Sequence, residues 1–106
     1  MFARRVYMHL KPNSVGEFTQ RLENDVLPLL RKQKGFQDEI TFVGQGGTEA
    51  FGVSVWNRAE DAEAYNHATY PEVAKILASV IDGAPEVETF DVANSTFHKI
   101  SAAGKV

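Results

Sequence analysis

The 106-residue sequence contains no cysteine, which excludes disulfides, thiolate nucleophiles and cysteine-ligated metal or iron–sulfur centres. It also has no excess of positive charge. The formal net charge is −3, so electrostatics gives no reason to expect nucleic acid or an anionic membrane as a partner. No stretch approaches the roughly 18 apolar residues of a membrane-spanning helix, and no signal-peptide core follows Arg4 and Arg5. We therefore expect a cytoplasmic protein that binds neither nucleic acid nor membrane.

Signatures of cofactor binding are also missing. Residues 44–49 (GQGGTE) match neither the phosphate-loop pattern G-x-x-x-x-G-K-[ST] nor the dinucleotide pattern G-x-G-x-x-G, and they are typical of a hairpin tip. The three histidines, His9, His67 and His98, have neither i,i+4 nor H-x-H spacing, which argues against a metal site. We expect no metal, flavin, haem or other cofactor.

The sequence does have the composition of a folded domain, with 43% hydrophobic and 24% charged residues. Its hydrophobic period switches between two and about 3.6 residues, which separates strands from helices. Ser14 and Glu17 have capping-box spacing at the start of the first helix, and Pro28 predicts a kink within it. The expected elements are a strand over 2–10, a kinked helix over 14–33, a hairpin of strands over 36–44 and 49–56, two helical pieces over 58–68 and 70–82, and a strand over 86–100.

The order of these elements is β-α-β-β-α-β. It predicts a ferredoxin-like α+β fold, in which both helical regions cover one face of a four-stranded antiparallel sheet. No linker, internal repeat or shift in composition divides the chain. We therefore expect residues 1–106 to form a single domain.

Alternation along the strands assigns side chains to the two faces of the sheet. We expect the helix-covered face to contain Val6, Met8, Leu10, Ile40, Phe42, Phe51, Val53 and Val55. We expect the other face to contain Arg5, Tyr7, His9, Thr41, Val43, Ala50, Gly52, Ser54 and Trp56. A hydrated sheet face is usually richer in Lys and Glu. We interpret this second face as a subunit interface that includes Trp56; an open, hydrated face is the alternative.

Two segments, LKPNSVGEFTQRLENDVLPLLRKQKGFQDE (10–39) and FGVSVWNRAEDAEAYNHATYPEVAKIL (51–77), resemble the antibiotic biosynthesis monooxygenase superfamily. The shared signals are a proline-kinked first helix ending in Lys-Gly-Phe, a strand ending in tryptophan, an acidic helix start, and His67 four residues before Pro71. The resemblance implies a homodimer in which two sheets pack face to face into an α/β barrel. It also implies several possible activities: cofactor-free oxidation of polyketide phenols by molecular oxygen, oxidation of quinols, or haem degradation.

Candidate catalytic residues come from the first piece of the second helical region. Helix periodicity points Tyr65 toward the sheet, on one face with Ala62 and Thr69. The resemblance aligns Tyr65 with a tryptophan that lines the pocket of haem-degrading members; an ordinary buried tyrosine is the alternative. His67, about 200° around the helix from Tyr65, is the second catalytic candidate, or else a helix-end residue. The candidate substrate-binding residues are Tyr70 at the pocket mouth and Val6, Met8, Phe42 and Phe51 on the expected helix-covered face.

Two functions of different classes fit these features. One is a cofactor-independent monooxygenase acting on a small aromatic phenol or quinol, in which the protein supplies desolvation, orientation and stabilisation of the substrate anion. The other is a non-catalytic dimer that binds a small apolar or aromatic molecule. Haem degradation is disfavoured. In the haem-degrading branch an asparagine lines up near Val6 and a histidine lines up near Lys75, and this chain has neither of them.

Overall fold

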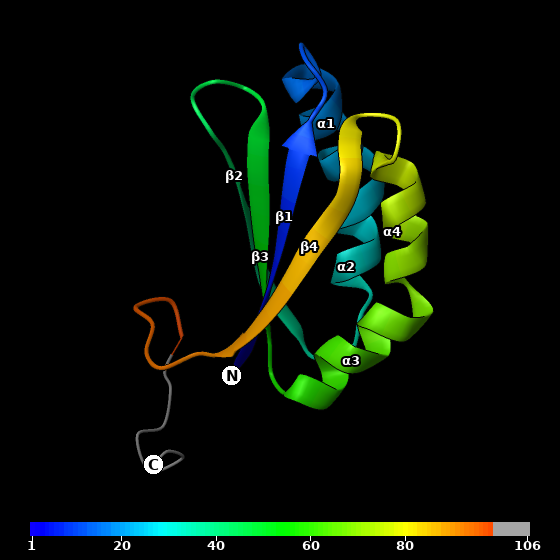
Figure 1. Cartoon of the computed structure of the whole chain (residues 1–106). Helices are drawn as coiled ribbons and strands as arrows, with labels where there is room; N and C mark the ends of the chain where they lie inside the picture. Colours follow the sequence, from blue (N-terminus) through cyan, green and yellow to red (C-terminus); the bar gives the residue numbers. More distant parts are fainter. Residues whose placement is uncertain (99–106) are drawn as a thin grey trace.

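Residues 1–98 are described by a computed structural model, in which the helices lie on one side of a four-stranded sheet (Figure 1). The strands pair in the order β2-β3-β1-β4, and each pairing is antiparallel. The predicted ferredoxin-like α+β fold is therefore confirmed. In chain order, the elements are β1 (Phe2–Leu10), α1 (Val15–Arg21), the π-helical turn η1 (Leu22–Val26), α2 (Leu27–Arg31), β2 (Phe36–Val43), β3 (Glu49–Trp56), α3 (Ala59–Ala68), α4 (Tyr70–Leu77) and β4 (Ile81–Asp91).

The first helical region is continuous but changes its hydrogen-bond register just before Pro28. The Leu27 N–H bonds the Leu22 carbonyl, five residues back, which is the π-helical pattern. Proline has no N–H with which to continue the i→i−4 ladder, and its ring crowds the preceding turn. The kink expected from the sequence thus takes the form of a π turn. Ser14 is the N-cap as predicted, but its side chain makes no capping hydrogen bond, so the capping box with Glu17 is not formed.

The second helical region breaks at Thr69, as the sequence predicts. Thr69 is the C-cap of α3 and the N-cap of α4, and Pro71 lies in the first turn of α4, where its missing N–H costs no helical bond. Ahead of β2, Gly35 has a φ of +79° and lies against the Asp61 side chain of α3. A Cβ at position 35 would collide with that carboxylate, so the close approach of this loop to α3 requires glycine.

The predicted face assignment is wrong for β2 and β3. In the observed register Val6 is opposite Gly52, while Phe51 is opposite Tyr7 and Phe42. Side chains alternate along a strand, so an assignment displaced by one residue turns every side chain to the other face. Ile40, Phe42, Phe51, Val53 and Val55 therefore lie on the face without helices, which we call the open face, and Thr41, Ala50, Gly52, Ser54 and Trp56 lie beneath the helices.

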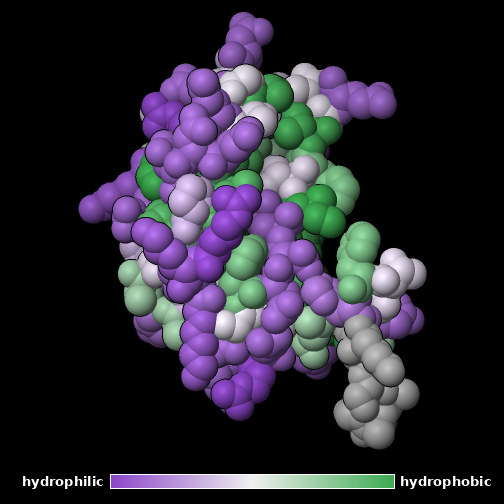
Figure 2. Space-filling model, turned by 180° about the vertical axis from the view of Figure 1, so that it is seen from behind, coloured by the Kyte–Doolittle hydropathy of each residue, from purple (hydrophilic) through white to green (hydrophobic). Residues whose placement is uncertain are grey.

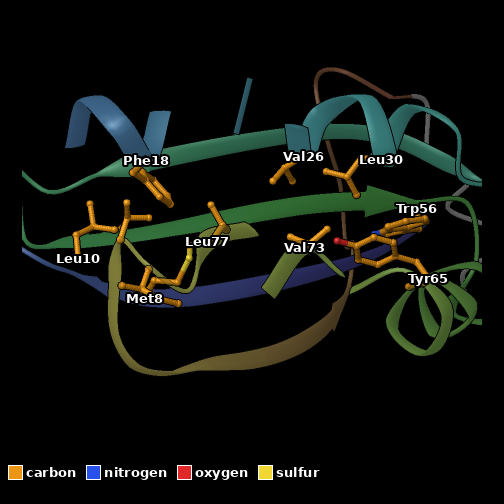
Figure 3. Packing of buried hydrophobic residues seen from close by; sticks show 13 residues of the cluster. Met8, Leu10, Phe18, Val26, Leu30, Trp56, Tyr65, Val73 and Leu77 are labelled. Atoms are coloured by element: carbon orange, nitrogen blue, oxygen red, sulfur yellow. The ribbon is translucent and has the colours of Figure 1, made fainter. Parts of the chain in front are cut away.

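Trp56 is fully buried in the core instead of lying at an interface. Its ring centroid is 5.1 Å from that of Tyr65 on α3, and its indole N–H donates a hydrogen bond of 2.9 Å to Ser54 Oγ. Figure 3 shows Trp56 and Tyr65 together at one end of the core, with Met8 and Leu10 toward the other end. Because the Ser54 hydroxyl, two residues earlier on the same face of the strand, accepts the indole N–H, Trp56 can be completely buried without an unpaired donor.

The last strand begins and ends earlier than predicted. It starts at Ile81, so that Gly83 and Pro85 lie inside β4 instead of preceding it. β4 is an edge strand, and proline is tolerated there because its missing N–H can face away from the sheet. Residues 92–98 are not strand, so the long strand expected over 86–100 is not formed in this part. Residues 99–100 lie outside the described part of the chain.

The surface seen from behind the view of Figure 1 is mainly polar, with apolar residues in separate patches (Figure 2). Among the large apolar side chains that are exposed, Ile40, Phe42 and Phe90 belong to the open face. No helix of residues 1–98 has both the length and the apolar character needed to cross a membrane.

Candidate functional site

A pocket lies between the sheet and the helices, beside the buried core. It encloses about 60 Å³ of free space, which is room for a few water molecules but less than the ~150 Å³ of a cavity that accepts benzene. A one-ring ligand therefore fits only if side chains at the pocket mouth move. The apolar wall comes from β1, η1, the helices and the start of β4: Val6, Met8, Leu22, Val26, Leu30, Val73, Ala74, Leu77 and Ile81.

The polar wall combines one row of residues across the sheet with two tyrosines from the α3–α4 junction. Glu39 on β2 is opposite Ser54 on β3, and Ser54 is opposite Arg4 on β1. Neighbouring strands lie about 4.8 Å apart, so the backbones at Glu39 and Arg4 are separated by roughly 10 Å. Tyr65 and Tyr70 line the same pocket from the helical side. A small ligand lying across β3 would therefore contact the Glu39 carboxyl group at one end and the Arg4 guanidinium at the other.

Arg4 is a buried cation, with only 3% of its surface exposed. Its Nη2 donates a hydrogen bond of 2.9 Å to Asn66 Oδ1 on α3. Its guanidinium carbon is 4.1 Å from the ring centroid of Tyr70 and 5.4 Å from that of Tyr65. Ring faces and a neutral amide stabilise the cation without cancelling its charge. The Arg4 end of the pocket is therefore electrostatically suited to the anionic or electron-rich part of an aromatic ligand.

Tyr65 places a phenol group at the pocket. Burial raises the pKa of Tyr65 to about 12, although the nearby Arg4 acts in the opposite direction. The side chain is therefore neutral near pH 7 and keeps its proton for donation. Figure 3 shows its oxygen pointing away from Trp56 toward Val73, another residue of the pocket wall. This geometry allows the hydroxyl to donate to a ligand oxygen.

Glu39 is the acidic group of the pocket. Its Oε2 accepts a hydrogen bond of 2.6 Å from the Thr41 hydroxyl. Burial raises the pKa of Glu39, and the Thr41 hydrogen bond partly opposes this. A Cβ built on Gly52 would lie 2.8 Å from the same Oε2, so the carboxylate occupies the space that a side chain at residue 52 would fill.

The structure brings only some of the predicted site residues together. Tyr65, Tyr70, Val6 and Met8 all line the pocket. His67 does not, since its side chain is 77% exposed and its Nε2 lies 3.3 Å from Glu63 one turn earlier. This exposure follows from the rotation of about 200° that separates His67 from Tyr65 on an α-helix.

Phe42 and Phe51 also lie away from the pocket. Their rings stack on the open face with centroids 4.9 Å apart. The prediction that they line the helix-covered face is wrong, because the small residues of β3, and not the large ones, face the helices. Their position makes them part of the apolar surface of the open face.

The polar side chains that sequence reasoning missed are Arg4, Glu39, Thr41 and Ser54. A signal for Arg4 was present, because it has the same strand parity as Val6. The others were hidden by the reversed faces of β2 and β3. Within residues 1–98, no three His, Asp or Glu side chains converge in the way that a metal site requires.

No protein-family model and no curated protein sequence matches the chain significantly. Several solved structures match the chain significantly. A monooxygenase of Streptomyces coelicolor, in complex with nanaomycin D, superposes with a TM-score of 0.77 at 16% identity, covering 92% of each chain. The cofactor-independent oxygenase SnoaB of Streptomyces nogalater gives 0.74 at 11% identity, covering 90% of this chain and 95% of that one. A Bordetella bronchiseptica protein assigned as an antibiotic biosynthesis monooxygenase gives 0.74 at 12% identity, covering 88% and 97%.

The chain has the fold of the antibiotic biosynthesis monooxygenases. The resemblance seen in the sequence is thereby confirmed at the level of architecture, over nearly the whole length of each neighbour. At these identities the similarity establishes the fold, whereas the chemistry depends on the groups that line the pocket. Within the antibiotic biosynthesis monooxygenase fold of this chain, the groups available for that chemistry are Arg4, Glu39, Tyr65 and Tyr70.

Proposed function

We propose that the protein is a cofactor-independent monooxygenase that oxidises a small aromatic phenol or quinol in the pocket between helices and sheet. The observation that carries this proposal is the meeting of a neutral phenol donor, Tyr65, and a buried cation, Arg4, at a pocket whose facing wall is apolar. The solved oxygenases of the same fold support it. A desolvated site with fixed donors stabilises an aromatic anion, and such an anion is electron-rich enough to reduce oxygen directly.

The substrate supplies all of the electrons in the proposed reaction. Its phenolate passes one electron to O₂, and the resulting ring radical and superoxide combine at a ring carbon that carries hydrogen. The peroxide oxygen takes up a proton. Loss of the C–H proton then forms the new C=O bond, breaks the O–O bond and releases water. One phenol and one O₂ thus give one quinone and one water, with one oxygen atom in each product.

The two groups of the pocket act at the start of this sequence. Tyr65 donates a hydrogen bond to the substrate oxygen, which orients the ring and favours its anionic form. Arg4, whose guanidinium carbon is 5.4 Å from the Tyr65 ring centroid, offsets the negative charge of the anion. Tyr70 holds the Arg4 guanidinium in position through its ring face, at 4.1 Å.

The working unit is a homodimer formed through the open face. Ile40, Phe42 and Phe90 on this face are 43%, 47% and 48% exposed. Ile40 and Phe42 lie on β2 and Phe90 lies on β4, at the two edges of the sheet; exposed apolar side chains that are spread over one sheet face in this way are typical of an interaction site. A second copy of the same sheet is a complementary partner, because pairing the two faces buries the same apolar set from each protomer.

A non-catalytic binding dimer is the second candidate function. The small free volume of the pocket, about 60 Å³, favours it, because a Michaelis complex with O₂ needs more room. This function requires only apolar contact with the ligand. The two candidates therefore differ in whether oxygen is consumed.

The test is oxygen uptake with isotope analysis. Purified protein is mixed with a panel of monocyclic phenols and quinols under ¹⁸O₂, without cofactor. The proposal predicts one O₂ consumed per substrate, with one labelled atom in the quinone and one in water. Saturable binding without oxygen uptake across the panel would favour the binding dimer.

A further inference from the structure

Glu39 combines a fixed position with a free oxygen atom. The Thr41 hydroxyl donates to Oε2 at 2.6 Å, and the absence of a side chain at Gly52 lets the carboxylate lie against the backbone of β3. No ion pair neutralises Glu39 within residues 1–98. One oxygen is thus occupied by the orienting threonine, and Oε1 is left for a ligand at the pocket wall.

The electrostatic surroundings favour proton exchange at this carboxyl group. The ionisable groups that line the same pocket are Arg4 on β1, Tyr65 on α3 and Tyr70 on α4. Tyr65 is neutral, and Arg4 lies across the neighbouring strand instead of forming an ion pair with Glu39. Burial raises the pKa of Glu39, which makes its carboxylate a stronger base than an exposed glutamate.

We propose that Glu39 is the general base of the reaction and that Thr41 is its positioning residue. This inference rests on the proposed function. The hydroxyl of a one-ring phenol donates to Oε1; its O–H bond breaks, its electron pair stays on the ring oxygen, and the proton forms the neutral carboxylic acid of Glu39. Arg4, roughly two strand spacings away, stabilises the anion at the other end of the ring. The same proton then protonates the peroxide formed with O₂.

This placement defines the substrate class more narrowly. The ligand needs a free aromatic hydroxyl over Gly52 and an electron-rich ring that reaches toward Arg4. Methylation of the hydroxyl removes the proton that Glu39 takes, so aryl methyl ethers are excluded as substrates. The small pocket favours one ring over a fused polycyclic system.

The test compares 4-nitrophenol with 4-nitroanisole, which differ only by methylation of the hydroxyl, as ligands of the wild-type protein and of Glu39→Gln. We expect Glu39→Gln to lower affinity for the phenol about tenfold or more, the worth of one charge-assisted hydrogen bond, and to leave affinity for the ether unchanged. The affinity of the wild-type protein for the phenol should fall on acidification, because protonation of Glu39 removes the charged acceptor. The affinity of Glu39→Gln should not show this Glu39-dependent fall. Glu72→Gln, an exposed change on α4, is the matched control.

An equal preference for the phenol over the ether in Glu39→Gln and wild type would overturn the role of Glu39. This readout needs no oxygen uptake, so it is independent of the proposed function. With a substrate that is turned over, Glu39→Gln should reduce kcat about 10²–10⁴-fold and remove the acidic limb of the pH–rate profile. Thr41→Val should shift the acidic limb of the pH–rate profile and should lower kcat less than Glu39→Gln does. A Thr41→Val variant with wild-type pH dependence would remove Thr41 from the mechanism.

Discussion

The Arg4 guanidinium lies over the Tyr70 ring, with its central carbon 4.1 Å from the ring centroid. Arg4 belongs to the first strand and Tyr70 to the first turn of α4, so this contact ties the sheet to the break between α3 and α4. The proline-containing start of α4 thereby places an aromatic ring over the cation of the pocket. Both residues line the pocket between the sheet and the helices.

Arg4 should matter more for binding anions than for folding. Arg4→Met removes the charge but keeps apolar bulk, and such replacements of buried charge are often near neutral for stability. Affinity for 4-nitrophenolate should fall about 10–100-fold, because hydrogen bonds to charged groups contribute ~1.5–3 kcal/mol. Isothermal titration at alkaline pH measures this. Arg31→Met, an exposed change on α2, should have no effect; an equal loss in both variants would contradict the assignment.

Phe42 should be essential to the dimer. Phe42→Glu places a carboxylate in the proposed interface of each protomer, so two like charges and their desolvation oppose association. We expect multi-angle light scattering to give a dimer mass for the wild type and a monomer mass for Phe42→Glu at micromolar concentration. Gln20→Glu adds the same charge to the exposed surface of α1 and should remain dimeric. A monomeric wild type would refute the interface.

Trp56 should act through stability and not through association. Trp56→Phe loses the indole donor that bonds Ser54 Oγ at 2.9 Å, together with part of a fully buried side chain. We expect a loss of roughly 1–3 kcal/mol in the free energy of unfolding, measured by urea denaturation. In a Ser54→Ala background the same change should cost less, since the hydrogen bond is already absent. Identical losses in both backgrounds would show that the bond contributes nothing.

Glu39 should make stability depend on pH. Burial raises its folded-state pKa above the unfolded value of about 4.3, so the native state binds more protons between those two values. The free energy of unfolding therefore falls as pH rises through that window. Glu39→Gln removes this loss, and its urea midpoint relative to wild type should increase as the pH rises above about 4.3, the unfolded value of a glutamate. Glu72→Gln, an exposed change on α4, is the matched control, and a difference that does not vary with pH for Glu39→Gln would contradict the raised pKa of this half-buried carboxyl group.

The fold could be predicted from the sequence because its signals are local. Alternation, helix spacing, the Pro28 kink and the Thr69 break each depend on a few neighbouring residues, and each lies where the sequence indicates. The bounds of the last strand were harder to predict from the sequence. Gly83 and Pro85 are ordinary loop residues by composition, and only their position at a sheet edge allows them inside β4.

The pocket could be predicted only in part because the faces of β2 and β3 are both partly apolar. The size of Phe51 favours a place in the core, yet the helices cover the face with Gly52 and Ser54. When both faces of a sheet carry apolar side chains, size alone does not identify the core face. The helix register was unambiguous, so Tyr65 was correctly directed toward the sheet while its polar neighbours on the strands were missed.

The most direct test of the proposed oxygenase is the rate of oxygen consumption by Tyr65→Phe with a phenol or quinol that the wild-type protein turns over. The change removes one hydroxyl and keeps the ring that packs on Trp56. If Tyr65 stabilises the substrate anion as it reacts, kcat should fall about 10²–10³-fold while KM changes much less. Wild-type turnover in Tyr65→Phe would contradict this account and leave Tyr65 as a residue of the core.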